Sequence, residues 1–151
     1  DSENQIHKQI TALTEAKKMA YEEAQCIRIQ DIMTFLHSEI GQRMKKAFEE
    51  NQLYREQPFV LAQSMKNIEK DWNGEETVLV QGIIDAYFIE DEEIVLVDYK
   101  TDFVRRGEEK KLIDRYHVQL EDYAQALERM TGRKVKERYI YSFTLGEAFS
   151  L

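Results

Sequence analysis

The sequence predicts a single domain of mixed α/β fold, with its helices and strands in the order α-α-β-β-β-α-β. Apolar residues recur three and four positions apart over residues 31–49 and 110–131, which is the spacing of amphipathic helices. Residues 77–90 and 94–101 are rich in Val, Ile and aromatic residues and flank a short polar turn, which predicts a β-hairpin. A length of 151 residues and a hydrophobic content of 42% suit one globular domain with a buried core.

The N-terminal part is predicted to be helical. Residues 1–30 are charged and Ala-rich, and we expect a peripheral helical extension there, outside a core of residues 31–151. Residues 31–49 predict one continuous helix that Asp31 can cap. Gly41 weakens the middle of that helix and marks a position for close packing.

The remaining segments complete the predicted order. Residues 54–64 predict a strand, and Pro58 within it favours the edge of a sheet. The helix over residues 110–131 ends at Gly132, and residues 134–145 predict the last strand. No internal repeat or linker interrupts this series.

Composition restricts the possible functions. The formal net charge of -8 argues against a protein that binds nucleic acid through charge alone, because such proteins are basic. The charge is unevenly distributed along the chain. Residues 1–99 carry 20 acidic and 10 basic side chains, whereas residues 100–138 carry 8 acidic and 11 basic ones. The basic stretch is either a solvated surface of mixed charge or a side that faces an anion.

Other classes are excluded by what the sequence lacks. A single cysteine rules out a disulfide framework and fits a reducing compartment. No apolar run reaches the ~20 residues of a membrane helix, and the polar start DSENQIHKQI does not resemble a signal peptide. We therefore expect a cytoplasmic protein with no membrane association. The sequence contains no Gly-x-x-x-x-Gly-Lys-Ser/Thr loop, so no ATP site is expected in it.

Strand alternation places two aspartates together in the predicted hairpin. If the chain turns at Asp91-Glu92, Asp85 lies opposite Asp98, and Lys100 points to the same side as Asp98. Opposed like charges lie ~5 Å apart at Cβ and destabilise a sheet. One aspartate can keep a proton, or a cation such as Mg²⁺ can lie between them and polarise a phosphodiester. An exposed hairpin face with two solvated aspartates remains an open alternative.

Three ordered motifs contain these residues. They are Gly82-Ile83-Ile84-Asp85, then Asp98-Tyr99-Lys100, then Gln119 and Tyr123 four positions apart on the long helix. Their spacing resembles the RecB-like branch of the PD-(D/E)XK nucleases over residues 31–150. The phrases VQGIIDAYF, IVLVDYKTD and YREQPF resemble in particular the C-terminal nuclease domain of AddA-type helicase–nuclease subunits. The resemblance implies a restriction-endonuclease-like core of order α-β-β-β-α-β with an extra N-terminal helix.

The resemblance also implies a role for each motif residue. The implied ligands of Mg²⁺, or of Mn²⁺, are Asp85, Asp98 and the backbone carbonyl of Tyr99. Lys100 would be the catalytic lysine beside the two carboxylates. Gln119 and Tyr123 share a helix face and would support the site and contact DNA. From the residues alone, Tyr123 also fits the apolar stripe of the core, whereas a buried Gln119 needs hydrogen-bond partners.

The function implied by the resemblance is that of a Mg²⁺-dependent deoxyribonuclease. It would hydrolyse phosphodiester bonds in single strands that a helicase motor in the same full-length chain delivers. Such a protein acts with a second helicase/nuclease subunit in processing double-strand DNA ends for recombinational repair. No ATP site is expected within this segment, because the phosphate-binding loop is absent. No iron–sulfur cluster is expected either, because the sequence has one cysteine.

One departure from the family leaves alternatives open. The usual Gly-Thr-x-x-His motif upstream of the sheet is absent, and His37 lacks that context. We therefore expect an excised C-terminal fragment with weak activity, or else a non-catalytic module of the same fold that guides DNA or contacts a partner protein. A restriction or junction-cutting endonuclease is a third possibility, which the pair Gln119 and Tyr123 argues against. Glu56 can approach the site from the first strand, although a surface glutamate on an edge strand is favoured.

Overall fold

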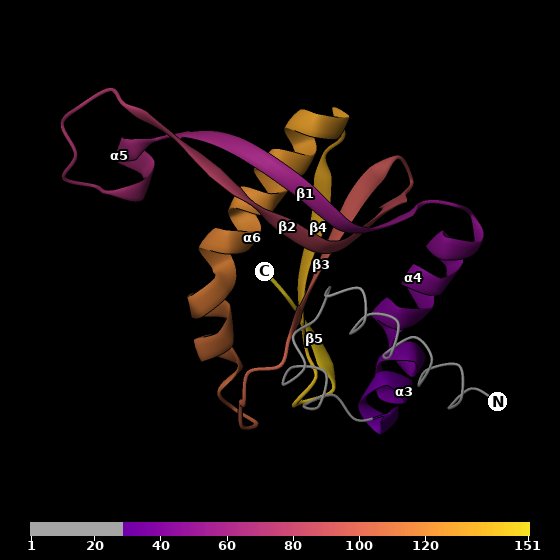
Figure 1. The fold of residues 1–151 in the computed structure, drawn as a ribbon. Coiled ribbons are helices and arrows are strands. Elements are labelled where there is room, and N and C mark those ends of the chain that lie inside the picture. Colours follow the sequence, from indigo (N-terminus) through magenta and orange to yellow (C-terminus); the bar gives the residue numbers. More distant parts are fainter. Residues whose placement is uncertain (1–28) are drawn as a thin grey trace.

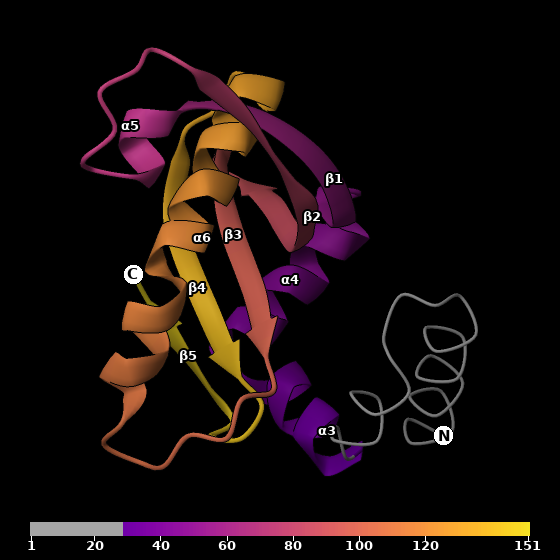
Figure 2. The ribbon, with the colours of Figure 1, turned by 60° about the vertical axis from the view of Figure 1, so that its left-hand side comes forward.

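A five-stranded sheet separates two helical layers in the computed structural model, which describes residues 29–151 (Figures 1 and 2). The strands lie in sequence order across the sheet, with β3 and β4 parallel and the other neighbours antiparallel. Helix α6 covers one face, and α3 and α4 cover the other. The elements are α3 (Ile29–His37), α4 (Glu39–Glu49), β1 (Leu53–Ser64), α5 (Met65–Ile68), β2 (Thr77–Glu90), β3 (Glu93–Lys100), α6 (Glu109–Thr131), β4 (Val135–Ser142) and β5 (Glu147–Ser150).

The mixed α/β fold and the order of its main elements are confirmed. Two elements were not predicted: the short helix α5 in the β1–β2 connection, and the edge strand β5. Pro58 lies in β1, which forms the other edge of the sheet, as expected. The expected helical extension falls almost entirely on residues 1–28, outside the described residues. No helix in the described part of the chain has both the length and the apolar character needed to cross a membrane.

The prediction of one continuous helix over residues 31–49 is wrong, because the helix breaks at Ser38. The Ser38 side chain caps α4 by accepting a hydrogen bond of 3.1 Å from the N–H of Gly41. A Cβ atom at Gly41 would lie 2.0 Å from the carbonyl oxygen of Phe35. The expected close packing at Gly41 is therefore real, and it is the approach of α3 to α4 that requires it.

Strand β3 is buried on both faces, since it lies between the two helical layers. Its side chains alternate as predicted: Ile94 and Leu96 pack toward α6, and Val95 and Val97 pack toward α4. The layer under α6 includes Leu112, Leu120, Leu127, Phe59, Leu61, Ile84 and Ile140. The layer under α4 includes Ile40, Met44, Ala47, Ala86, Phe88 and Tyr141.

The alternation of side chains along β2 is interrupted at one point. Strict alternation would place Ile84 and Ala86 on the same face, but Ile84 packs in the α6 layer and Ala86 in the α4 layer. The register between β1 and β2 continues unchanged across this point. The change of face coincides with Glu56 of β1, whose φ of 51° lies in the left-handed region and turns the side chains that follow it.

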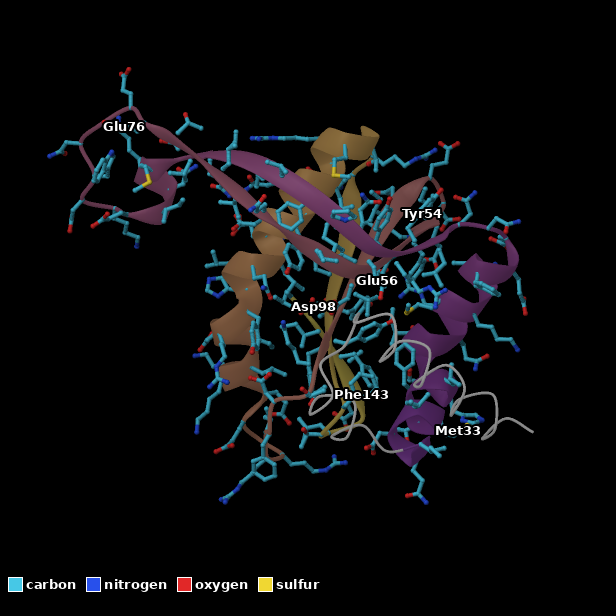
Figure 3. The ribbon with its side chains drawn as sticks, viewed as in Figure 1. Met33, Tyr54, Glu56, Glu76, Asp98 and Phe143 are labelled. Carbon is cyan, nitrogen blue, oxygen red and sulfur yellow. The ribbon has the colours of Figure 1, made fainter. Side chains whose placement is uncertain are left out.

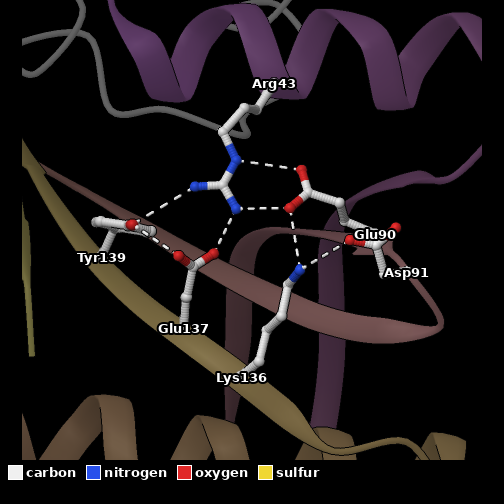
Figure 4. A network of polar contacts seen from close by, with 6 residues as sticks. All are labelled: Arg43, Glu90, Asp91, Lys136, Glu137 and Tyr139. Atoms are coloured by element: carbon white, nitrogen blue, oxygen red, sulfur yellow. Dashed lines mark hydrogen bonds and ion pairs between the residues drawn. The ribbon is translucent and has the colours of Figure 1, made fainter.

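A charged network fastens α4 to the closed end of the β2–β3 hairpin (Figure 4). Arg43 donates two hydrogen bonds to Glu90, of 2.8 and 3.1 Å, and a further one to Glu137 on β4. Lys136 also pairs with Glu90, at 3.0 Å. This network connects three elements at the turn end of the hairpin.

Replacing Arg43 with leucine should lower the free energy of unfolding by about 1–2 kcal/mol at pH 7. Hydrogen bonds from Arg43, and then from Lys136, hold the pKa of Glu90 at about 2, below its ordinary 4.5. A carboxylate with a lowered pKa stabilises the fold above its unfolded pKa and loses that effect as pH falls through the folded one. The difference between the variant and the wild type should therefore shrink between about pH 4.5 and pH 2.

Urea unfolding of the 151-residue chain at several pH values measures this difference. Lys46→Leu is the matched control, because Lys46 is exposed on the same helix. A loss of stability in Arg43→Leu that stays constant down to pH 2 would contradict the assignment to Glu90.

Candidate active site

The β2–β3 hairpin brings Asp85 and Asp98 together. Its pairing runs from Glu90↔Glu93 to Ala86↔Val97, which confirms the predicted register, and Asp85 and Asp98 occupy the next position outward. There the ladder stops, and Oδ2 of Asp85 accepts a hydrogen bond of 2.9 Å from the N–H of Tyr99. A side chain of β2 thus takes the place of a backbone acceptor at the point where the two strands part.

The two aspartates are not a solvated pair, so that alternative is wrong. Asp98 is 2% exposed, at the centre of the molecule between α6 and the sheet (Figure 3). Burial, and then the charge of Asp98, raise the pKa of Asp85 well above its ordinary value, while the N–H of Tyr99 and the charge of Lys100 oppose this rise. The arrangement stores electrostatic repulsion that a cation can relieve.

Lys100 points to the same side as Asp98, as the alternation predicted. Its Nζ lies 2.8 Å from Oδ2 of Asp98 and donates a hydrogen bond of 3.1 Å to Oε1 of Gln119 on α6. Gln119 is half-buried, and this hydrogen bond gives its amide oxygen the partner that it needs. Helix α6 and strand β3 together fix the position of the ammonium group.

Tyr123 lies one turn further along the same face of α6. It is 8% exposed, and its ring packs edge-on against Phe59 with 5.1 Å between centroids. Burial, and then the charges of Asp98 and Asp85, raise the pKa of Tyr123 to about 12, so its hydroxyl stays protonated. Gly82 lies beneath these rings, where an added Cβ would come within 3.0 Å of Phe59.

The donor atoms at this point fit a hard divalent cation that keeps several of its waters. Among residues 29–151, no donor makes a hydrogen bond of suitable geometry to Oδ2 of Asp98, although Nζ of Lys100 lies 2.8 Å from it as an ion pair. Because the N–H and carbonyl of a strand residue face the same side, the Tyr99 carbonyl is expected to face β2, where its N–H meets Asp85. No cluster of three His, Cys, Asp or Glu side chains suited to a metal occurs in that range. Two carboxylates and one carbonyl suit Mg²⁺, which binds few protein ligands, better than a metal that needs four.

Comparison with known families agrees with this geometry. Residues 2–148 match the model of the PD-(D/E)XK nuclease superfamily. The chain belongs to this superfamily. The three residues Asp98-Tyr99-Lys100 have the order (D/E)-x-K that the superfamily's name describes, and Asp85 precedes them on the neighbouring strand.

Curated relatives of this superfamily member are named as ATP-dependent helicase/nuclease subunits. One from Alkaliphilus metalliredigens is 43% identical over 148 residues, one from Clostridium kluyveri 42% over 147, and one from Clostridium perfringens strain SM101 38% over 147. These matches cover 97%, 95% and 94% of the chain. The chain spans only 12% of the length of each relative.

The structure adds two residues to the surroundings of the PD-(D/E)XK motifs. Tyr116, an aromatic residue of the apolar stripe of α6, places its ring centroid 4.0 Å from Nζ of Lys100. It precedes Gln119 by three positions on α6, so the two residues share a helix face. This spacing is the feature of the sequence that indicates a position of Tyr116 beside Lys100. Glu56 is half-buried on the edge strand β1, and its neighbours Arg55 and Gln57 pair with Ala86 and Ile84, on either side of Asp85.

His37 is exposed, with Nδ1 2.7 Å from the carbonyl oxygen of Met33 on its own helix. It contributes no ligand to the aspartate pair, because no metal-binding cluster of three such side chains occurs within the described range.

Proposed function

We propose that this chain is the Mg²⁺-dependent nuclease domain of a larger helicase–nuclease, and that it hydrolyses phosphodiester bonds in single-stranded DNA. One observation carries the proposal: two opposed aspartates, one of them fully buried, share a site with a lysine whose ammonium group is fixed by α6. A structural core rarely keeps such an arrangement without a cation, because buried like charges destabilise the fold.

Asp85, Asp98 and the carbonyl of Tyr99 are the groups that would hold the metal. A bound Mg²⁺ would polarise the phosphodiester and lower the pKa of a coordinated water. The two carboxylates would orient it between β2 and β3, with its remaining positions open to water and phosphate oxygens. Mn²⁺ can satisfy the same oxygen ligands.

The remaining residues act on the phosphate side of the reaction. The ammonium of Lys100 can stabilise the negative charge that develops on the phosphate oxygens, or orient the attacking water. Gln119 holds that ammonium through its hydrogen bond of 3.1 Å. Tyr123 is buried beside the two aspartates as a neutral hydroxyl group and supports the site from α6.

The names of the relatives supply the proposed context. A domain of such an ATP-dependent helicase/nuclease would receive a single strand from a helicase motor elsewhere in the same polypeptide. A second helicase/nuclease subunit, action on double-strand DNA ends in recombinational repair, and a cytoplasmic location belong to the same proposal. The net charge of -8 is compatible with it, because delivery by a motor replaces capture of DNA by a basic surface.

Replacing Lys100 with alanine in the full-length protein should reduce cleavage of single-stranded DNA by at least about 100-fold, because charge on the phosphate loses its fixed counter-charge. A 5′-labelled oligonucleotide in the presence of Mg²⁺ measures cleavage, and the rate of ATP hydrolysis reports the integrity of the motor. Lys110→Ala is the matched control, since Lys110 is an exposed lysine at the start of α6.

Undiminished cleavage by Lys100→Ala would exclude this site as the nuclease centre. Absence of metal-dependent cleavage in the wild type would instead favour the non-catalytic module. That alternative is supported by the lack of a cluster of three metal-binding side chains within residues 29–151.

A further inference from the structure

Lys100 is held from a third direction, by an aromatic ring. Its Nζ lies 4.0 Å from the ring centroid of Tyr116, within the range of a cation–π interaction. The other two contacts of the ammonium are with Asp98 and Gln119, and the side chain of Lys100 is only 16% exposed. The ring therefore closes the side of the ammonium group that neither polar partner covers.

The ring itself is fixed by the loop that follows β3. The hydroxyl of Tyr116 lies 3.0 and 2.9 Å from the two carboxylate oxygens of Asp102, to which it donates. Arg115 donates to the same carboxylate at 2.7 Å, and Thr144 donates to the Asp102 backbone carbonyl at 2.7 Å. Both carboxylate oxygens are thus engaged, so Asp102 anchors the tyrosine ring and is not a further metal ligand.

A lysine needs such an anchor more than most side chains. Its four-carbon stem has many rotamers, and fixing one of them costs conformational entropy. A ring against the ammonium excludes the rotamers that would move it away from Asp98 and Gln119 into the space that the ring fills. Its apolar surface also strengthens the attraction to Asp98 by keeping water away.

We infer that Tyr116 is a positioning residue that holds the Lys100 ammonium group in place for phosphodiester hydrolysis, and that Asp102 acts through it. This inference rests on the proposed function, because it assigns Tyr116 a task only if Lys100 acts on the phosphate. The ring carries the effect, and the hydroxyl serves to orient the ring.

The test compares Tyr116→Leu and Tyr116→Phe in the full-length protein, with His117→Ala as the control, because His117 is the exposed next residue of α6. Tyr116→Leu should lower kcat for single-stranded DNA roughly 10- to 30-fold with KM and ATP hydrolysis unchanged. Tyr116→Phe keeps the ring and should stay within about threefold of the wild type. In a Lys100→Ala background, Tyr116→Leu should cause no further loss.

Each outcome decides the matter. A kcat within about twofold of wild type in Tyr116→Leu, an equal loss in Tyr116→Phe, or an additive loss in the double variant would overturn the inference. A parallel fall in ATP hydrolysis and thermal stability would also overturn it, since that is the result of a purely structural role. If Lys100→Ala itself keeps full cleavage, the proposed function fails; if only Tyr116→Leu keeps it, the inference alone fails.

Discussion

Asp98→Asn in the full-length protein should reduce DNA hydrolysis by at least about 100-fold in Mg²⁺ while ATP hydrolysis continues at the wild-type rate. Asp98 is 2% exposed and has an oxygen without an aligned hydrogen bond among the described residues, so its charge is placed for a cation. Asparagine keeps the shape of the buried side chain and removes the charge. Lys100 then loses its ion-pair partner as well, which adds to the loss of metal affinity.

The measurement is the initial rate of strand cleavage at increasing Mg²⁺ and Mn²⁺ concentrations. Asp114→Asn provides the control, because Asp114 is an exposed aspartate on α6. A variant Asp98→Asn that reaches the wild-type rate at saturating metal would show that this carboxylate is not part of the metal site.

Asp85→Asn should have opposite effects on stability with and without a divalent cation. Without a divalent cation, the free energy of unfolding of the variant should be about 1–2 kcal/mol higher than that of the wild type. The reason is that burial and the charge of Asp98 disfavour an ionised Asp85. The amide oxygen of asparagine can still accept the hydrogen bond from the N–H of Tyr99. With Mg²⁺, the wild type should gain stability in proportion to its affinity, and the variant should gain little.

Thermal unfolding of the chain with and without MgCl₂ tests this prediction, with an expected gain of about 3–6 °C for the metal-free variant. Asp71→Asn is the control, since Asp71 is exposed in the β1–β2 connection. A metal-free Asp85→Asn protein that is less stable than the wild type would show that the aspartate pair does not repel.

The arrangement of the aspartates was predictable because it depends on local geometry. A hairpin with a two-residue turn fixes its register, and alternation along β3 then fixes the side on which Asp98 and Lys100 lie. The partner of Lys100 on α6 followed only from the resemblance, which singled out Gln119. The structure adds the physical reason, a hydrogen bond between the two side chains.

Features that depend on packing between distant segments could not be predicted. The break at Ser38 arises where α3 and α4 meet, and Gly41 alone indicated close packing without showing a change of direction. The change of face near Ile84 coincides with the left-handed backbone of Glu56 on β1, a conformation that glutamate rarely adopts. The contact of Tyr116 with Lys100 depends on the rotation of α6 about its axis, which a broad apolar stripe leaves undetermined.

The Arg43 network has a mechanical consequence for the site. Arg43 and Lys136 hold the turn end of the β2–β3 hairpin through Glu90. The two aspartates lie at the other end, where the two strands separate. Beyond Ala86↔Val97, the hydrogen bond from the N–H of Tyr99 to the Asp85 side chain joins the two strands. Small side-chain rotations there can change the distance between the carboxylates without breaking backbone hydrogen bonds of the sheet. Such adjustable spacing would allow the proposed metal site to accept ions of different radius, such as Mg²⁺ and Mn²⁺.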